Sequence, residues 1–341
     1  MKKILNVLYV TTDGCYLSLD GENVVINKDH ETIARIPLHT IEGVVSFGFK
    51  GVSPALMGKC AELNKQIVFL SPNGKFLARS IGKQYGNILL RRKQFSLSQN
   101  ERMSIAKNII SAKLYNSASV LRRGFSDHPD VNDAIKLKES SISLKDLSKK
   151  AYSVKDDAEL RGMEGEGGSI YFSVFNQLIC QNKDTFDFNG RTRRPPLDRV
   201  NAMLSFGYSL LTSMCVSALE TVGLDPYCGV FHVDRPGRCS LALDLEEEFR
   251  AYLVDRFVLT LINRKMVNER HFAVRENGAV SLNDEGRKIF LQNWFDKKKE
   301  VITHPYLGEK MEIGFIPHVQ ALLLGRYFRG DLSEYPPFLW K

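Results

Sequence analysis

The chain has 341 residues, 43% hydrophobic and 25% charged, which suits about two domains with sizeable cores. Its formal net charge of +8 favours a polyanionic partner such as nucleic acid, although many proteins without such a partner carry as much. No continuous apolar run of roughly 20 residues predicts a membrane span, and the start lacks the long apolar region of a signal peptide. The six cysteines form no CxxC pair, which argues against a zinc site or a disulfide framework. We therefore expect a cytoplasmic protein with no membrane partner.

Residues 1–86 are predicted to form a small β-rich domain. Short β-branched and aromatic runs separated by turn dipeptides predict strands at 4–10, 15–20, 23–27, 32–37, 41–47, 65–70 and 76–80. A helix is expected over Ser53–Asn64, because serine is a good N-cap and Pro54 suits the first helical position. This part contains no dense acid or histidine cluster, so we interpret it as a scaffold or dimerisation domain.

Residues 87–341 are predicted to form a larger, mainly α-helical catalytic domain, which makes the fold class α+β. Apolar periodicity predicts helices at 100–124, 158–172, 201–223, 241–266, 284–299 and 317–330. Residues 126–155 are polar and are interpreted as a connector with short helices. A hairpin is expected around Asn277-Gly278. The tail, with Pro336-Pro337 and Trp340, is expected to pack on another surface or on a partner.

Two acids, Glu164 and Glu166, lie in a segment dense in glycine. Glycine lowers helix propensity but allows another backbone or a ligand to approach closely. The segment is either a closely packed helix that carries a functional acid or a flexible loop.

Arginines flank the double proline 195–196 and recur in a later turn. Arg194, Arg199, Arg235 and Arg238 are candidate phosphate contacts, because guanidinium forks match phosphate oxygens. A solvated basic loop is the alternative. Tyr208, in the helix after the prolines, could position DNA or act as a covalent nucleophile; a metal site would make the covalent link unnecessary.

The stretch 229–250 combines a histidine with four acids. Asp244 and Glu247 are three residues apart and share a helix face, whereas Glu246 and Glu248 are expected to face water. His232 beside two carboxylates suits a hard divalent cation. Alternatively, the acids stabilise the start of the helix through its dipole, and His232 is a buried turn residue.

Three patterns stand in order along the chain: L-R-G-x-E-G at 160–165, R-P-P-x-D-x-x-N-A-x-L-S-x-x-Y at 194–208, and G-x-x-H-x-x-R-P-G-R-x-S-L-A-L-D-L-x-E-x-F-R at 229–250. Together they resemble the CRISPR-associated integrase and endonuclease family, the first Cas protein, which inserts new spacers into the CRISPR array. The resemblance covers essentially the whole chain. The ending YPPFLWK resembles the type I-C subgroup.

The resemblance implies that Glu164, His232 and Glu247 bind a metal ion, with Asp244 as a further acid of the catalytic site. Two carboxylates and an imidazole suit Mg²⁺ or Mn²⁺. The implied reaction is transesterification that joins the 3′-hydroxyl ends of double-stranded protospacer DNA to the CRISPR repeat. Arg194, Arg199, Tyr208, Arg235 and Arg238 are the expected DNA contacts.

The family also implies a homodimer, assembly with the small second Cas protein and, from the tail, a Cas-four nuclease partner. Two other functions stay open on the residues alone. One is a stand-alone metal-dependent nuclease on branched or single-stranded DNA, and the other is a non-catalytic DNA-binding scaffold.

Overall fold

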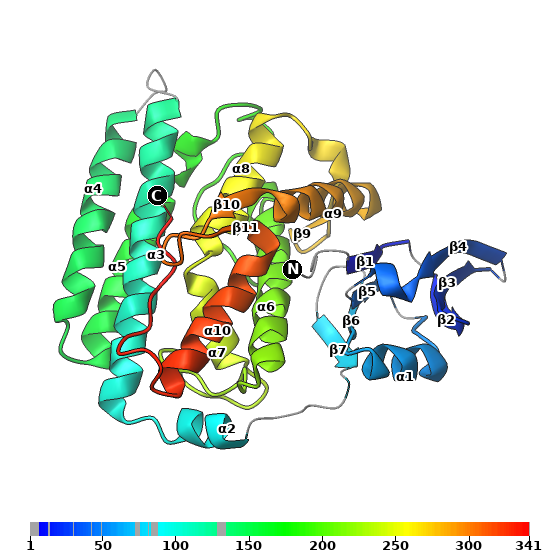
Figure 1. Ribbon diagram of the computed structural model, residues 1–341. Coiled ribbons are helices and arrows are strands. Elements are labelled where there is room, and N and C mark those ends of the chain that lie inside the picture. The colour runs from blue at the N-terminus through cyan, green and yellow to red at the C-terminus, as the bar shows by residue number, and fades with distance from the viewer. Residues whose placement is uncertain are drawn as a thin grey trace. The chain divides into compact units, whose positions relative to one another are not determined.

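The computed structural model describes residues 7–340 except 13, 30, 42, 49, 72–75, 81, 83–87 and 128–133. By its internal contacts the chain divides into two compact units (Figure 1). The first comprises residues 1–85, 270–273 and 281–300, and the second comprises residues 86–269, 274–280 and 301–341. The sheets of the first unit and the helices of the second give the predicted α+β class.

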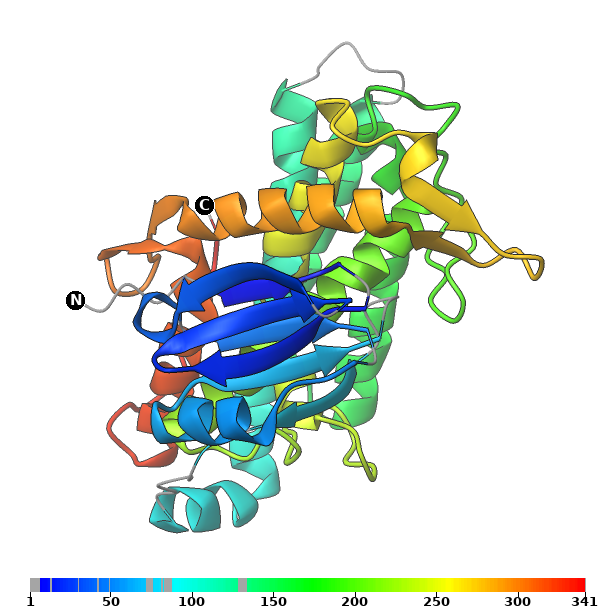
Figure 2. The ribbon, with the colours of Figure 1, turned by 90° about the vertical axis from the view of Figure 1, so that its right-hand side faces the viewer.

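The first unit contains two small sheets (Figure 2). One sheet has the strand order β1 (Val7–Val10), β5 (Gly43–Phe47), β6 (Gln66–Leu70) and β7 (Phe76–Ser80). Its first three strands are parallel and the last is antiparallel. The other sheet is antiparallel, in the order β2 (Tyr16–Asp20), β3 (Asn23–Lys28) and β4 (Glu31–Pro37). The strand predictions are confirmed within about two residues; the predicted turn at 72–74 and residues 4–6 lie outside the described residues.

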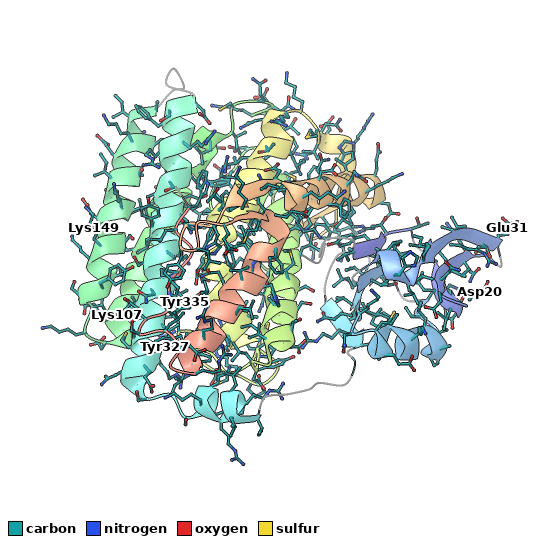
Figure 3. All side chains as sticks on the ribbon, in the orientation of Figure 1. Asp20, Glu31, Lys107, Lys149, Tyr327 and Tyr335 are labelled. Carbon is teal, nitrogen blue, oxygen red and sulfur yellow. The ribbon has the colours of Figure 1, made fainter. Side chains whose placement is uncertain are left out.

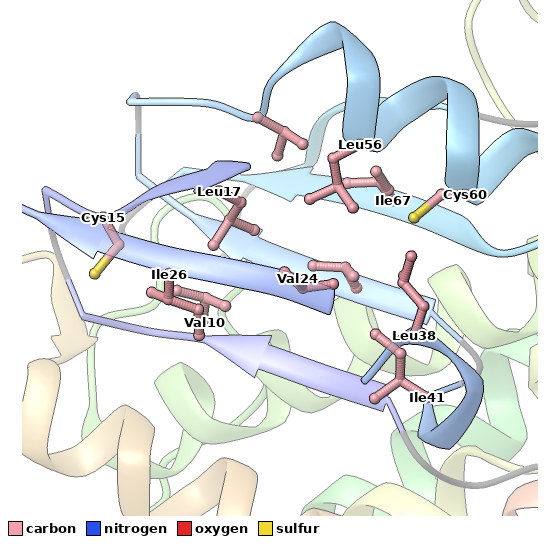
Figure 4. Close-up of a cluster of buried hydrophobic side chains, with 12 residues drawn as sticks. Val10, Cys15, Leu17, Val24, Ile26, Leu38, Ile41, Leu56, Cys60 and Ile67 are labelled. Atoms are coloured by element: carbon pink, nitrogen blue, oxygen red, sulfur yellow. The ribbon is translucent and has the colours of Figure 1, made fainter. Parts of the chain in front are cut away.

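A cluster of buried apolar side chains lies in the core of this unit (Figure 4). Leu17, Leu56 and Ile67 meet there with no exposed surface. Helix α1 (Pro54–Glu62) begins as predicted, because Ser53 Oγ accepts a hydrogen bond from the backbone N–H of Leu56 at 3.2 Å. Burial of apolar surface therefore holds this unit together.

Helix α9 (Asp284–Lys299) also belongs to the first unit. The side chain of Asn283 caps its start by accepting from the N–H of Gly286. Near its end, Lys298 Nζ donates to the hydroxyl of Tyr9 at 3.1 Å. This hydrogen bond ties the helix to β1, far away in the sequence.

The second unit is mainly helical. Its helices are α2 (Ile88–Phe95), α3 (Gln99–Asp127), α4 (Ala134–Lys150), α5 (Asp157–Ser173), α6 (Arg199–Val222), α7 (Ser240–Glu247), α8 (Arg256–Asn263) and α10 (Ile316–Phe328). Helix α3 packs against α4, α5 and α7, and α6 packs against α7 and α10. A short hairpin of the second unit pairs β10 (Val301–Thr303) with β11 (Lys310–Glu312). The predicted hairpin of β8 (Phe272–Val274) and β9 (Val280–Leu282) is confirmed, and its residues 272–273 and 281–282 belong to the first unit.

The prediction of a connector with short helices at 126–155 is wrong, because α4 is one helix of 17 residues. Leu137, Ser141, Leu144 and Ser148 recur every three or four residues and are buried. Two of these buried positions are serines: Ser141 donates to the carbonyl of Ala118, and Ser148 donates to that of Ser111. A helix that buries hydroxyls against α3 gives a weak hydrophobic period.

The prediction of one uninterrupted helix over 241–266 is also wrong. Helix α7 ends at Glu247, a π-helical turn covers Arg250–Asp255, and α8 follows. Leu245, Phe249, Leu253, Phe257 and Leu261 are all buried and recur every four residues. Because an α-helix has 3.6 residues per turn, a wider turn is needed to keep that period on one side.

Helix α6 is long and apolar enough to cross a membrane by length and composition. However, 61% of its most apolar window is buried inside the protein. Its contacts with α7 and α10 are those of a core helix.

Candidate metal and DNA site

Helix α5 carries Glu164 to the surface of α3. The helix interpretation of the glycine-dense segment is confirmed, and Asp156 caps the helix by accepting from the N–H of Glu159. At Gly167, one turn after Glu164, an added Cβ would lie 2.1 Å from a methyl carbon of Leu114. A larger residue would force Leu114 to move, so glycine favours the close approach of the two helices that brings Glu164 beside Lys113.

Glu247, at the end of α7, is a buried carboxylate between two cations. Its Oε2 lies 2.8 Å from Lys113 Nζ, and its Oε1 lies 2.9 Å from Arg250 Nη1. Lys113 Nζ also donates to Glu164 Oε1, so one ammonium contacts both acids. Burial alone would raise the pKa of Glu247. The charges of Arg250 and Lys113 outweigh this effect and lower the pKa to about 2. Glu247 is therefore charged at neutral pH.

Asp244 orients the ring of His232. The fully buried carboxylate of Asp244 accepts backbone N–H groups from Val230 at 2.6 Å, Phe231 at 3.1 Å and His232 at 2.8 Å. Its Oδ1 lies 2.6 Å from His232 Nδ1. The other ring nitrogen, Nε2, is then 4.0 Å from Glu247 Oε1. A carboxylate on the far ring nitrogen is the usual support of a metal-binding histidine.

Within the part of the chain that the structure describes, no three histidine, cysteine, aspartate or glutamate side chains are close enough together to hold a metal ion. One observation nevertheless fits a cation between Glu164 and Glu247. The Lys113 ammonium is already held by both acids, and it lies 2.8 Å from the buried Oε2 of Glu247. A metal ion would take the place of this ammonium, and His232 Nε2 would supply the nitrogen ligand.

A cavity of about 800 Å³ opens beside these acids in the second unit. Glu164 and Glu247 line it together with Arg191, Arg193 and Tyr208. A volume of this size exceeds what a metal ion with its ligands needs and falls in the range of sites for larger ligands.

Tyr208 is fixed in the wall of this cavity. Its hydroxyl donates to Asp255 Oδ1 at 2.6 Å, and the guanidinium groups of Arg191 and Arg250 lie 5.3 Å and 5.1 Å from its ring centroid. Burial and the nearby Asp255 raise the pKa of Tyr208 well above its usual value. Such a hydroxyl is a poor nucleophile, which favours the positioning interpretation.

The four arginines predicted to contact phosphate do not line this cavity, as far as the described residues go. Arg194 and Arg235 are exposed, and Arg238 is half-buried in a turn where its N–H donates to the carbonyl of Arg235. Arg199 is half-buried and donates to the carbonyl of Thr185 at 3.1 Å. The structure therefore brings Glu164, Glu247 and Tyr208 together at the cavity and places these arginines elsewhere.

The prediction that Glu246 and Glu248 face water is wrong. Glu246 is 1% exposed, accepts from Arg250 Nε at 2.9 Å and also accepts from Thr212. Glu248 has no exposed surface. Helix α7 is buried on more than one face, because Leu245 and Glu246 are both buried beside Glu247, so its end has no side that faces water.

Sequence reasoning also missed Lys113 and Arg250. Arg250 could have been found, because it lies three residues after Glu247 and opposite charges at that spacing on a helix attract each other. Lys113 gave no local signal, since its partners lie 51 and more residues away.

Comparisons with known proteins identify the family of the chain. The family described as CRISPR associated protein Cas1 matches residues 8–296. The chain is 46% identical to CRISPR-associated endonuclease Cas1 1 of Chlorobaculum tepidum and 47% identical to Cas1 2 of Rhodospirillum rubrum, in each case over 100% of both chains.

Solved structures share the fold. A Cas1 protein from Thermotoga maritima superposes with a TM-score of 0.81 at 26% identity, covering 97% of this chain and 99% of that one. A casposase bound to integration product has a TM-score of 0.83 at 24% identity, over 99% and 95% of the two chains. A Cas6-RT-Cas1–Cas2 complex has a TM-score of 0.82 at 21% identity, over 100% of this chain and 36% of that one. At these last two identities the similarity shows the fold alone.

Proposed function

This chain belongs to the Cas1 family of CRISPR-associated endonucleases and integrases, and we propose that it works with one divalent metal ion held by Glu164, His232 and Glu247. The single observation that carries the site is the Lys113 ammonium shared by Glu164 and the buried Glu247. Two carboxylates that hold one cation are the arrangement that a hard metal ion needs. The chain is thus an enzyme of CRISPR adaptation.

The protein residues have separate tasks at this site. Glu164 and Glu247 provide negative oxygens, His232 provides Nε2, and Asp244 fixes the ring through Nδ1. Arg250 holds Glu247 in its charged form and in place. When bound, the metal ion orients the phosphate and offsets the charge that develops on its oxygens during the attack of a 3′-hydroxyl.

DNA is the polyanion that the +8 charge attracts. Tyr208 positions the strand in the cavity, and Arg194, Arg199, Arg235 and Arg238 contact phosphates outside it. Loss of such an arginine weakens binding broadly and flattens its salt dependence. The substrates are double-stranded protospacer DNA and the CRISPR repeat.

The physiological metal is Mg²⁺ or Mn²⁺, with the imidazole ligand favouring Mn²⁺. The resemblance of the tail supports the type I-C subgroup and, with it, a Cas4 nuclease partner. A curated relative in Geobacter sulfurreducens, 33% identical, is named as a Cas4/Cas1 fusion. The Cas1–Cas2 complex with the same fold supports assembly with the small second Cas protein. The β-rich domain 1–86 forms the homodimer, the helical domain 87–341 is catalytic, and the protein works in the cytoplasm.

The decisive experiment is a strand-transfer assay. Purified protein, the small second Cas protein, a short duplex with free 3′ ends and a repeat-containing plasmid are mixed with Mn²⁺. Glu164→Ala and His232→Ala abolish joining, whereas Glu166→Ala on the exposed side of α5 keeps it. Joining that survives Glu164→Ala overturns the site, and shortened strands without joined products would favour a stand-alone nuclease.

A further inference from the structure

The C-terminal segment 335–340 packs against the helices of the second unit, to which it belongs. In Figure 1 the red end of the chain runs along α3, and Figure 3 labels Tyr335 in this segment. Tyr335 and Phe338 have no exposed surface, and the Phe338 ring packs against Phe249 with centroids 5.6 Å apart. The tail therefore fills part of the core beside the end of α7.

The tail supplies donors to Glu248, the residue after Glu247. The buried carboxylate of Glu248 accepts from the hydroxyl of Tyr335 at 2.6 Å and from the N–H of Phe338 at 2.7 Å. Gln320 Nε2 on α10 provides a third donor at 3.0 Å. A buried carboxylate that loses its donors carries a large desolvation penalty, so this position depends on the tail.

The tail is also linked to α3 through Asn116. Asn116 Nδ2 donates to the carbonyl of Glu248 at 2.7 Å and to the carbonyl of Phe338 at 2.8 Å. Its Oδ1 accepts from the N–H of Trp340 at 2.8 Å. Asn116 lies three residues after Lys113, on the same side of α3, and Lys113 contacts Glu247. Asn116 thus joins the end of α7 and the tail to α3, one turn away from the lysine whose place a metal ion would take.

We propose that residues 335–340 are a positioning element of the metal centre, which fixes Glu247 through Glu248 and Asn116. This inference rests on the proposed metal role of Glu247. When the tail donors are lost, Glu248 has to find water or other partners, and the end of α7 shifts. The adjacent residue Glu247 shifts with it, and the distance between the carboxylates of Glu247 and Glu164 changes. Metal affinity falls, while DNA affinity does not change.

Tyr335→Phe tests this with little disturbance, because it removes only the hydroxyl, which donates to Glu248 and accepts from Gln320 Nε2, and leaves the ring in place. Tyr327→Phe is the matched control: Tyr327 also appears in Figure 3, and its hydroxyl donates to no residue that the structure describes. Calorimetry measures Mn²⁺ affinity, and strand transfer is followed across Mn²⁺ concentrations. Tyr335→Phe weakens Mn²⁺ binding about tenfold, as expected for one lost hydrogen bond to a buried carboxyl group, and saturating Mn²⁺ restores the rate. Tyr327→Phe changes neither value.

A chain ending at Glu334 shows a larger shift in the same direction, with unchanged DNA affinity in the absence of metal. If Tyr335→Phe lowers the melting temperature but leaves Mn²⁺ affinity and requirement unchanged, the tail is structural only and the proposal is overturned. Unchanged Mn²⁺ binding by Glu247→Ala instead contradicts the proposed metal site, so the two failures are identified by different variants.

Discussion

The core of the first unit and the end of α7 bury side chains of opposite character. The first core gathers side chains such as Leu17, Leu56 and Ile67, all apolar and without exposed surface. The end of α7 buries three consecutive carboxylates, Glu246 at 1%, Glu247 at 3% and Glu248 at 0% exposure. Glu246 is bound by Arg250 and Thr212, and Glu247 is bound by Lys113 and Arg250. Glu248 is bound by the tail.

The difference separates stability from function. Apolar burial is non-directional, so the first core tolerates changes at the cost of stability alone. Buried charges need each partner in place. Removal of one partner leaves the other group buried and unpaired, and the folded state then bears the full desolvation penalty of that group. Substitutions at the end of α7 should therefore affect both folding and metal binding.

Leu56→Ala should give the largest loss of stability. We expect the free energy of unfolding to fall by about 4 kcal/mol, since the leucine is fully buried and its loss leaves a cavity. Urea denaturation measures the loss, and Leu63→Ala at a 41% exposed position should change it by less than about 0.5 kcal/mol. Mn²⁺ affinity of the folded protein should stay unchanged, and a loss of that affinity would erase the contrast between the two regions.

Glu246→Ala should cost slightly less, about 3 kcal/mol, because the Arg250 guanidinium loses one of its two carboxylate partners. Glu246→Gln retains an acceptor oxygen and should cost less than the alanine variant. Urea denaturation and Mn²⁺ calorimetry on the same samples should show both stability and affinity reduced. A change below about 0.5 kcal/mol would mean that Arg250 does not depend on this carboxylate.

Lys113→Ala should strengthen Mn²⁺ binding about tenfold, a change of about 1.4 kcal/mol, because the ammonium that competes for Glu164 and Glu247 is gone. Lys107→Ala on the same helix, whose ammonium donates to the carbonyl of Tyr152, is the control and should have no effect. Calorimetry distinguishes the outcomes. Weaker binding in Lys113→Ala would show that the lysine supports the metal site and does not compete with it.

The smallest effect concerns the start of α3, where Glu101 and Ser98 form a capping box. The hydrogen bond from Lys93 lowers the pKa of Glu101 most, and hydrogen bonds from Ser98 lower it less; together they bring it from 4.5 to about 2. The folded pKa lies below the unfolded one, so the stabilisation is present above pH 4.5 and is lost as the pH falls toward 2. The difference between wild type and Glu101→Gln in urea midpoint should shrink below pH 4.5. A constant difference from pH 7 to pH 3 would contradict this.

The two regions also differ in how far the sequence predicts them. The strands of the first unit follow from alternation and turn residues, and α1 follows from Ser53 and Pro54, because each signal is local. Glu164, His232 and Glu247 could be proposed only through motifs spread over more than eighty residues. Lys113 and Tyr335 could not be predicted at all, since their partners are set by the packing of α3 and the tail against α7. The burial of Glu246 and Glu248 was mispredicted for the same reason.

The most direct measurement is anomalous scattering from crystals grown with Mn²⁺. The account predicts one strong peak within about 2 to 2.5 Å of Glu164, His232 Nε2 and Glu247, with Lys113 Nζ moved away from the two acids. A peak that is absent from this position, or that lies on Asp244 without contact to Glu164, would contradict the proposed metal centre.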